Sequence, residues 1–170
     1  MDLQLKDRTC LVTGASRGIG RGIAKVLAAE GCRVAVVARR ASLLEELADE
    51  IAADGHARPF VLAEDLTAEG VMQRIRERAL AELGGLDVLV NNAGSSRPVP
   101  WNATEEQWLE GMRLNFELVR RLTNEFIPGM RARRYGRIIN ITGAYEPPNV
   151  NIASVAKAAL HNWAKGLSPE

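Results

Sequence analysis

The sequence predicts an α/β fold, in which a doubly wound parallel sheet carries helices on both faces. Short runs rich in β-branched residues alternate along the chain with stretches whose apolar residues recur at helical spacing. The second run, residues 34–38, is apolar at every position, which is typical of a strand buried on both faces. A glycine-rich turn at residues 14–20 joins the first run to the first helical stretch. Together these patterns favour repeated strand–helix units with right-handed crossovers.

The length and composition fit one globular domain, residues 1–170. A hydrophobic fraction of 46% with 25% charged residues is typical of a folded core. The formal net charge of +1 shows no basic or acidic excess, so neither nucleic acid nor a membrane surface is expected as a partner. Cys10 and Cys32 lack a metal-ligand spacing and are expected as buried free thiols, with no metal site. The N-terminus has no signal region and no apolar run reaches about 18 residues, which predicts a cytoplasmic protein.

Three strand–helix units are expected in the first half of the chain. The strands are residues 9–13, 34–38 and 60–62, each rich in apolar residues. The three helices follow from apolar stripes, formed in turn by Ile19, Ile23, Val26 and Leu27, by Leu44, Leu47 and Ile51, and by Val71, Ile75, Ala79 and Leu83. Gly31 and Gly55 are expected to end the first two helices. Thr67 is expected to be the N-cap of the third.

Two further units are expected in the second half. The strands are residues 87–90 and 137–141. Thr104 and Gln107 resemble a capping box that opens one long helix, whose stripe is Met112, Phe116, Val119, Leu122, Phe126 and Met130. The stripe of the final helix is Ala156, Leu160, Trp163 and Leu167. The irregular stretches 95–102 and 143–152 follow strands, so we expect them at the carboxyl edge of the sheet, where ligands bind.

The turn between the first strand and the first helix is a candidate phosphate site. Its sequence is Thr13-Gly14-Ala15-Ser16-Arg17-Gly18-Ile19-Gly20. Glycines let a phosphate approach the backbone, and a helix N-terminus presents unpaired N–H groups and a positive dipole end. Gly14 is expected to make the tight turn, Gly18 to admit a pyrophosphate and Gly20 to let the helix pack on the sheet. The placement between strand and helix predicts a dinucleotide-binding, Rossmann-type domain.

The spacing Thr-Gly-x-x-x-Gly-x-Gly resembles the short-chain dehydrogenase/reductase family, and further segments match in the same order. They are Asp65 after the third strand, Asn91-Asn92-Ala93-Gly94 at the end of the fourth, Asn115 in the long helix, residues 136–141 and Lys157-Ala158-Ala159-Leu160. The resemblance covers essentially the whole chain. It implies an NAD(P)(H)-dependent oxidoreductase that transfers hydride between the cofactor and a small-molecule carbonyl or alcohol. The 3-oxoacyl-carrier-protein reductase branch is the nearest label, although no residue identifies that substrate.

The resemblance also implies which residues bind the cofactor. They are Gly14, Ser16, Arg17, Gly18, Ile19, Gly20, Arg39, Arg40, Asp65, Leu66, Asn91, Ala93, Gly94 and Lys157. An NAD enzyme usually has an acidic residue after the second strand to bind the ribose 2′-hydroxyl, whereas an arginine accommodates a 2′-phosphate. Here Arg39 and Arg40 follow that strand, no acidic residue precedes Glu45, and Arg17 adds another cation. NADP(H) is therefore favoured over NAD(H).

The active-site part of the pattern departs from the family. The family's proton donor is a tyrosine four residues before the lysine, and this chain has Ala153 there. The family's serine aligns with Gly143, beside Thr142. The expected catalytic residues are thus Asn115, Lys157, Thr142 and Tyr145, the last two as candidate substitutes for the missing groups. The alternative interpretation is a non-catalytic NADP(H)-binding sensor or assembly protein.

Family members usually continue with two more strands, a helix and a substrate-covering loop. This sequence ends soon after the helix that follows the fifth strand, so it is either a fragment or a short protein. In both cases the fifth strand is expected to be an edge of the sheet, and unpaired apolar edges favour association. Residues 104–130 and the helix with Trp163 resemble the family's dimer-forming helices, which predicts a homodimer or homotetramer.

Overall fold

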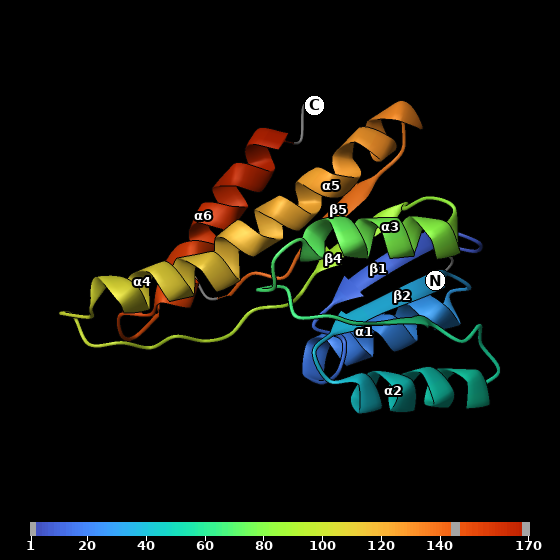
Figure 1. The fold of residues 1–170 in the computed structure, drawn as a ribbon, viewed down its shortest axis with the longest axis horizontal. Helices are drawn as coiled ribbons and strands as arrows, with labels where there is room; N and C mark the ends of the chain where they lie inside the picture. The colour runs from blue at the N-terminus through green and yellow to red at the C-terminus, as the bar shows by residue number, and fades with distance from the viewer. Residues whose placement is uncertain (1–2, 144–146, 168–170) are drawn as a thin grey trace.

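The computed structural model describes residues 3–143 and 147–167. Five strands form one sheet in the order β3-β2-β1-β4-β5, and every neighbouring pair is parallel. They are β1 (Thr9–Thr13), β2 (Arg33–Ala38), β3 (Phe60–Ala63), β4 (Val88–Asn91) and β5 (Arg137–Asn140). The predicted doubly wound α/β fold is confirmed, and all five strands lie within two residues of their expected bounds (Figure 1).

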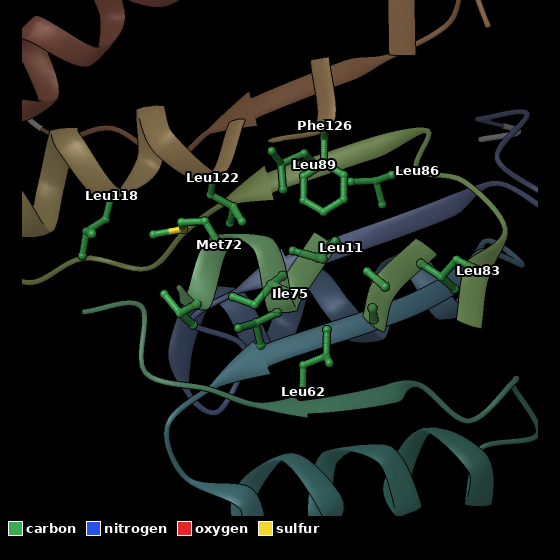
Figure 2. Close-up of a cluster of buried hydrophobic side chains, with 14 of the residues drawn as sticks. Leu11, Leu62, Met72, Ile75, Leu83, Leu86, Leu89, Leu118, Leu122 and Phe126 are labelled. Carbon is green, nitrogen blue, oxygen red and sulfur yellow. The ribbon is translucent and has the colours of Figure 1, made fainter. Parts of the chain in front are cut away.

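Helices cover both faces of the sheet. α1 (Gly18–Ala29) and α2 (Ala41–Ala53) cover one face, and α3 (Val71–Leu83) and α5 (Leu118–Ala132) cover the other (Figure 1). Successive strand residues point to opposite faces of the sheet. In β1, Leu11 therefore points toward α3 and α5, whereas Cys10 points toward α1 and α2. Figure 2 shows Leu11 and Leu62 packed against side chains of α3 and α5, among them Ile75 and Phe126. Both cysteines are buried and free, as predicted.

α1 packs on the sheet through only part of the predicted face, since Leu27 is buried and Ile23 packs against the core but the other two residues do not. Ile19 and Val26 are 65% and 57% exposed, so the expectation that they face the core is wrong. The residues that do face it are small apart from one leucine: Gly20, Ala24, Leu27 and Ala28. Small side chains let the helix backbone lie close to the strands.

α3 begins later than predicted. Gly70, with φ +67°, is its N-cap, and the expectation that Thr67 caps it is wrong. The backbone N–H and the hydroxyl of Thr67 both donate to Asp65 Oδ1, at 2.9 and 2.8 Å. Thr67, three residues before the N-cap, therefore belongs to a turn closed by Asp65.

The long helix predicted from Thr104 onward consists of three elements. α4 (Glu105–Met112) begins with the predicted capping box, which is confirmed because Thr104 and Gln107 bond each other reciprocally. The π-helical turn η1 (Arg113–Glu117) follows, and α5 continues from it. The N–H of Leu118 donates to Arg113 O, five residues earlier. The prediction of one regular helix is thus wrong at the turn that contains Asn115, and π-helical turns often occur at functional sites.

α6 (Ile152–Leu167) packs against α4 and η1, and Figure 1 shows it beside them. Gly111 of α4 lies against the side chain of Ile152, where an added Cβ would lie 2.9 Å from Ile152 Cβ. The missing side chain at Gly111 therefore leaves room for the first residue of α6. Among the described residues, no helix is long and apolar enough to cross a membrane.

Candidate active site

The carboxyl ends of β1 and β4 are held together by Thr13 and Asn92. The hydroxyl of Thr13 donates to Val90 O at 3.4 Å and accepts from the N–H groups of Asn92 and Ala93, both at 3.0 Å. Asn92 Nδ2 donates to Thr13 O at 3.0 Å and to Gly14 O at 3.1 Å. From β1 the next strands are added toward one edge of the sheet, and from β4 the next strand is added toward the other edge. Open α/β sheets bind ligands at the carboxyl ends of the strands at such a point.

The glycine turn leaves open space at the N-terminus of α1. Gly14 has φ +66°, and a Cβ there would lie 3.0 Å from Ala93 Cα, so the turn requires glycine. Gly18, the first residue of α1, has no heavy atom within 4 Å of an added Cβ. The N-cap residue Arg17 gives the first helical turn no side-chain hydrogen bond. Backbone N–H groups and the positive end of the helix dipole thus face a space that suits an anion.

A cavity of about 770 Å³ extends from this turn along the sheet edge. Ten of the residues expected to bind the cofactor line it: Gly14, Ser16, Arg17, Ile19, Arg39, Arg40, Asp65, Leu66, Ala93 and Gly94. Arg17 comes from the glycine turn, whereas Arg39 and Arg40 follow β2, so the fold brings three cations to one cavity. Hydrogen bonds from Thr67 hold the pKa of Asp65 below its usual value, and the charge of Arg39 lowers it further.

Four of the expected cofactor residues, Gly18, Gly20, Asn91 and Lys157, do not line this cavity. Gly18 is exposed beside the open space described above. Gly20 is buried beneath the turn, where an added Cβ would lie 2.5 Å from Gly14 O. Asn91 is 1% exposed, and its Nδ2 donates to Thr123 Oγ1 at 3.0 Å and to Asn140 Oδ1 at 2.9 Å. Asn91 therefore joins β4 to α5 and β5.

Asn115 and Lys157 meet at Gly94, which follows β4. Asn115 Oδ1 accepts from Ser95 N at 3.1 Å, and its Nδ2 donates to Gly111 O at 2.9 Å, so both ends of the amide are held. A Cβ at Gly94 would lie 2.7 Å from Asn115 Oδ1 and 3.4 Å from Lys157 Nζ. Burial lowers the pKa of Lys157. Among the described residues, no hydrogen bond or ion pair is made to its amine.

The position of Lys157 depends on the start of α6. Asn151 Oδ1 accepts from Ala153 N at 3.0 Å, as an N-cap does, and from Arg97 N at 3.2 Å. The N–H of Ile152 also donates to Arg97 O, at 3.0 Å. The start of α6 is therefore attached to the loop that follows β4. Ala153, one helical turn before Lys157, is buried and has no ionisable group.

Of the two substitute donors expected from the sequence, one can be placed. Thr142 is exposed just beyond β5. The preceding residue, Ile141, donates its N–H to Asn91 O at 2.9 Å, so Thr142 lies at the same sheet edge as the cavity. Tyr145 lies outside the described residues. The described residues hold no group of three metal-ligating side chains.

Ten further residues line the cavity and are absent from the predicted set: Val37, Ala38, Glu64, Thr67, Asn92, Ser95, Arg97, Glu110, Leu114 and Leu118. Asn92 belongs to the run Asn91-Asn92-Ala93-Gly94, which the sequence pattern places at the end of β4. Arg97 and Glu110 form an ion pair at 3.0 Å between a loop and α4, which no local pattern indicates. Ser95 Oγ is buried and has no hydrogen-bond partner among the described residues, which suits a ligand contact.

Comparisons with a family model and with individual proteins point to the same family. The model of the family described as short chain dehydrogenase matches residues 8–170. A short chain dehydrogenase of Pseudocercospora fijiensis is 34% identical over 173 residues, covering 98% of this chain and 56% of that protein. A 3-oxoacyl-[acyl-carrier-protein] reductase of Escherichia coli is 34% identical over 172 residues, covering 99% of this chain. The chain spans between 56% and 69% of the length of these two relatives.

Solved structures agree with the fold. A 7α-hydroxysteroid dehydrogenase complexed with NADH and 7-oxo glycochenodeoxycholic acid superposes with a TM-score of 0.90 at 31% identity. The match covers 99% of this chain and 68% of that one. A metagenomic short-chain oxidoreductase in complex with NADP gives a TM-score of 0.89 at 31% identity, covering 97% and 76% of the two chains.

Proposed function

The chain belongs to the short-chain dehydrogenase family, and we propose that it binds NADP(H) and transfers hydride between this cofactor and a carbonyl or alcohol. The observation that carries the proposal is the cavity of about 770 Å³ in which the glycine turn, three arginines and Gly94 line one continuous surface. Asn115 and Lys157 lie directly behind Gly94. A cavity of this size is within the range that holds small molecules and cofactors.

The residues present fit a phosphorylated dinucleotide. The N-terminus of α1 beside Gly18 would bind the pyrophosphate, and the orphan hydroxyl of Ser95 would donate a hydrogen bond farther along the cavity. Arg39, with Arg17 or Arg40, would contact the adenosine 2′-phosphate, because guanidinium groups pair well with phosphate oxygens. The two structural relatives are described with NADH and with NADP, so the choice rests on these arginines.

Reduction of a carbonyl builds negative charge on its oxygen, which must be stabilised and then protonated. Bound NADPH would supply the hydride. Lys157 would carry the positive charge nearest the reacting oxygen and would also bind the nicotinamide ribose, as its counterpart in the family does. Ala153 supplies no acid. This same observation favours a second candidate function, nucleotide binding without turnover, in a sensor or assembly protein.

Calorimetric titration with NADPH and NADH tests the cofactor. Wild type is expected to bind NADPH more tightly. Arg39→Asp is expected to weaken NADPH binding by about 10- to 100-fold, the equivalent of one charge-assisted contact, and to leave NADH binding nearly unchanged. Arg121→Asp, an exposed arginine of α5 outside the cavity, makes the same charge change and serves as the control. Tighter binding of NADH by wild type would refute the assignment.

A panel of carbonyl compounds separates the two candidate functions. It includes simple ketones and a 3-oxoacyl thioester, the class suggested by the reductase relative. Oxidation of NADPH that depends on an added carbonyl supports the reductase. Tight NADPH binding with no turnover on any member of the panel supports the non-catalytic alternative.

A further inference from the structure

We propose that the ammonium group of Lys157 itself donates the proton to the carbonyl oxygen during reduction. This proposal rests on the function proposed above and assigns its missing acid. The amine lies against Gly94, which lines the cavity, and next to the Asn115 amide. Lys157 does not line the cavity itself, but its Nζ is the ionisable atom nearest to an added Cβ at Gly94, so a carbonyl compound lying over Gly94 would be close to it.

The helix that carries Lys157 is anchored at its start from two sides. Asn151 caps α6 and ties its start to Arg97, and Gly111 of α4 lies against Ile152. Lys157 follows within the next turn and a half of this anchored helix. A side chain that extends from a fixed helix into a partly buried site suits proton delivery, because the donor must stay within hydrogen-bond reach of the oxygen.

The other candidate donors that the structure describes are weak. The Ala153 side chain is a methyl group. The Asn115 amide is occupied by Ser95 N and Gly111 O, and an amide is a very poor acid. Thr142 has an aliphatic hydroxyl, which does not ionise near neutral pH. Lys157 is the strongest acid among these side chains.

The surroundings of Lys157 make its ammonium a better acid than an ordinary lysine. Burial disfavours the charged form and lowers the pKa. Opposing carboxylates would raise it, but Glu110 of α4 pairs with Arg97, and Glu117 of η1 makes no ion pair with Lys157. Arg113 of η1 donates to Thr67 O, and the exposed His161 and Lys165 lie farther along α6. Within the described residues, no carboxylate pairs with the amine to offset the effect of burial.

The proposed step balances as follows in atoms and charge. Hydride from NADPH forms the new C–H bond at the carbonyl carbon, and the π electrons of the C=O bond move to oxygen. An N–H bond of Lys157 breaks as the O–H bond of the alcohol forms. Lys157 would be left as a neutral amine and would regain its proton from a solvent acid, so each turnover would consume one NADPH and one proton and yield NADP⁺ and the alcohol.

Titration of the lysine signals by NMR tests the acid without turnover. The chain has four lysines, at positions 6, 25, 157 and 165, so the Lys157 signal is assigned from its loss in Lys157→Arg. In the NADP⁺ complex we expect Lys157 to titrate below about 10.4, the value for lysine in a short peptide. A titration at or above that value would overturn the proposal.

Kinetics of carbonyl reduction then test the role. Lys157→Arg keeps the positive charge, but a guanidinium cannot release its proton, so we expect kcat to fall by about 10²- to 10⁴-fold. The rate is measured at saturating NADPH, and calorimetry measures NADPH affinity separately, because Lys157 would also contact the nicotinamide ribose. Lys165→Arg, two turns later and exposed, is the matched control. Because the acid must be protonated, the wild-type rate should fall as pH rises through the Lys157 pKa.

Each failure has its own pattern. Undiminished reduction by Lys157→Arg would overturn the proposal and leave the proposed function intact, with water as the donor. Loss of reduction in Tyr145→Phe, with Lys157→Arg still active, would overturn it in favour of the Tyr145 phenol. Absence of NADPH binding or of any reduction by wild type would refute the proposed function, and the proton donor with it.

Discussion

Two glycines of α1, only two residues apart, should respond in opposite directions to substitution by alanine. Gly20 faces the sheet, and an added Cβ would lie 2.5 Å from Gly14 O. Gly22 is exposed on the same helix, and an added Cβ would meet no atom within 4 Å. The pair therefore separates the effect of crowding from the effect of alanine on the helix itself.

The magnitude follows from these distances. Ordinary van der Waals contact begins near 3.4 Å, so Gly14 O lies about 0.9 Å too close to the new methyl group. It is a backbone atom and cannot rotate away, and it also accepts a hydrogen bond from Asn92 Nδ2. Overpacking with a weakened hydrogen bond should lower the free energy of unfolding by about 2–4 kcal/mol in Gly20→Ala. Gly22→Ala should raise it by about 0.5–1 kcal/mol.

Urea unfolding followed by circular dichroism measures both free energies, and calorimetry measures NADPH binding by the same variants. Displacement of α1 from the turn should weaken NADPH binding in Gly20→Ala and leave it unchanged in Gly22→Ala. Equal stability and equal NADPH affinity in the two variants would refute the reasoning, because close helix–turn packing would then have no energetic weight.

Two further predictions concern the sheet and the assembly. Asn91→Ala should lower the free energy of unfolding by about 1–3 kcal/mol, because Thr123 and Asn140 lose their buried hydrogen-bond partner. Asn124→Ala, at an exposed site of α5, should lower it much less. Equal losses of stability in urea unfolding would contradict this role of Asn91. We also expect a homodimer or homotetramer formed through α4, α5 and α6, where Leu109 is 63% and Val155 46% exposed. Light scattering should show an oligomer for the wild-type protein and weaker association for Leu109→Asp. A wild-type monomer at micromolar concentration would count against this prediction.

The strands were the most predictable part of the fold. A strand of a parallel sheet is buried on both faces, so its apolar run is visible without knowledge of its neighbours. The helices depend more on their surroundings. Ile19 lines the cavity of the candidate site and Val26 is exposed, which apolar periodicity does not register. The π-helical turn at residues 113–117 contacts α6, and no glycine or proline within it indicates the irregularity from the sequence.

The candidate site divides in the same way. The glycine turn and the arginines after β2 are local motifs, and their places follow from the order of strands and helices. The buried hydroxyl of Ser95 and the Arg97–Glu110 ion pair arise from tertiary packing between a loop and α4. Asn91 and Asn92 are adjacent and identical in type, yet one bonds α5 and β5 and the other holds the glycine turn. Successive residues of an extended chain point to opposite sides, so the two asparagines have different partners although their residue type is the same.

The π-helical turn gives one long helical segment two independently oriented surfaces. Each residue of an α-helix advances the chain by about 100° around the axis, so one extra residue rotates everything after it by about that angle. α4 thereby presents Gly111 to α6, while α5 presents Leu118, Leu122 and Phe126 to the core. Substitutions on α4 can reshape contacts with α6 without changing the register of α5 on the sheet. Removal of a single residue from the turn would restore a continuous helix but rotate one of these surfaces out of contact.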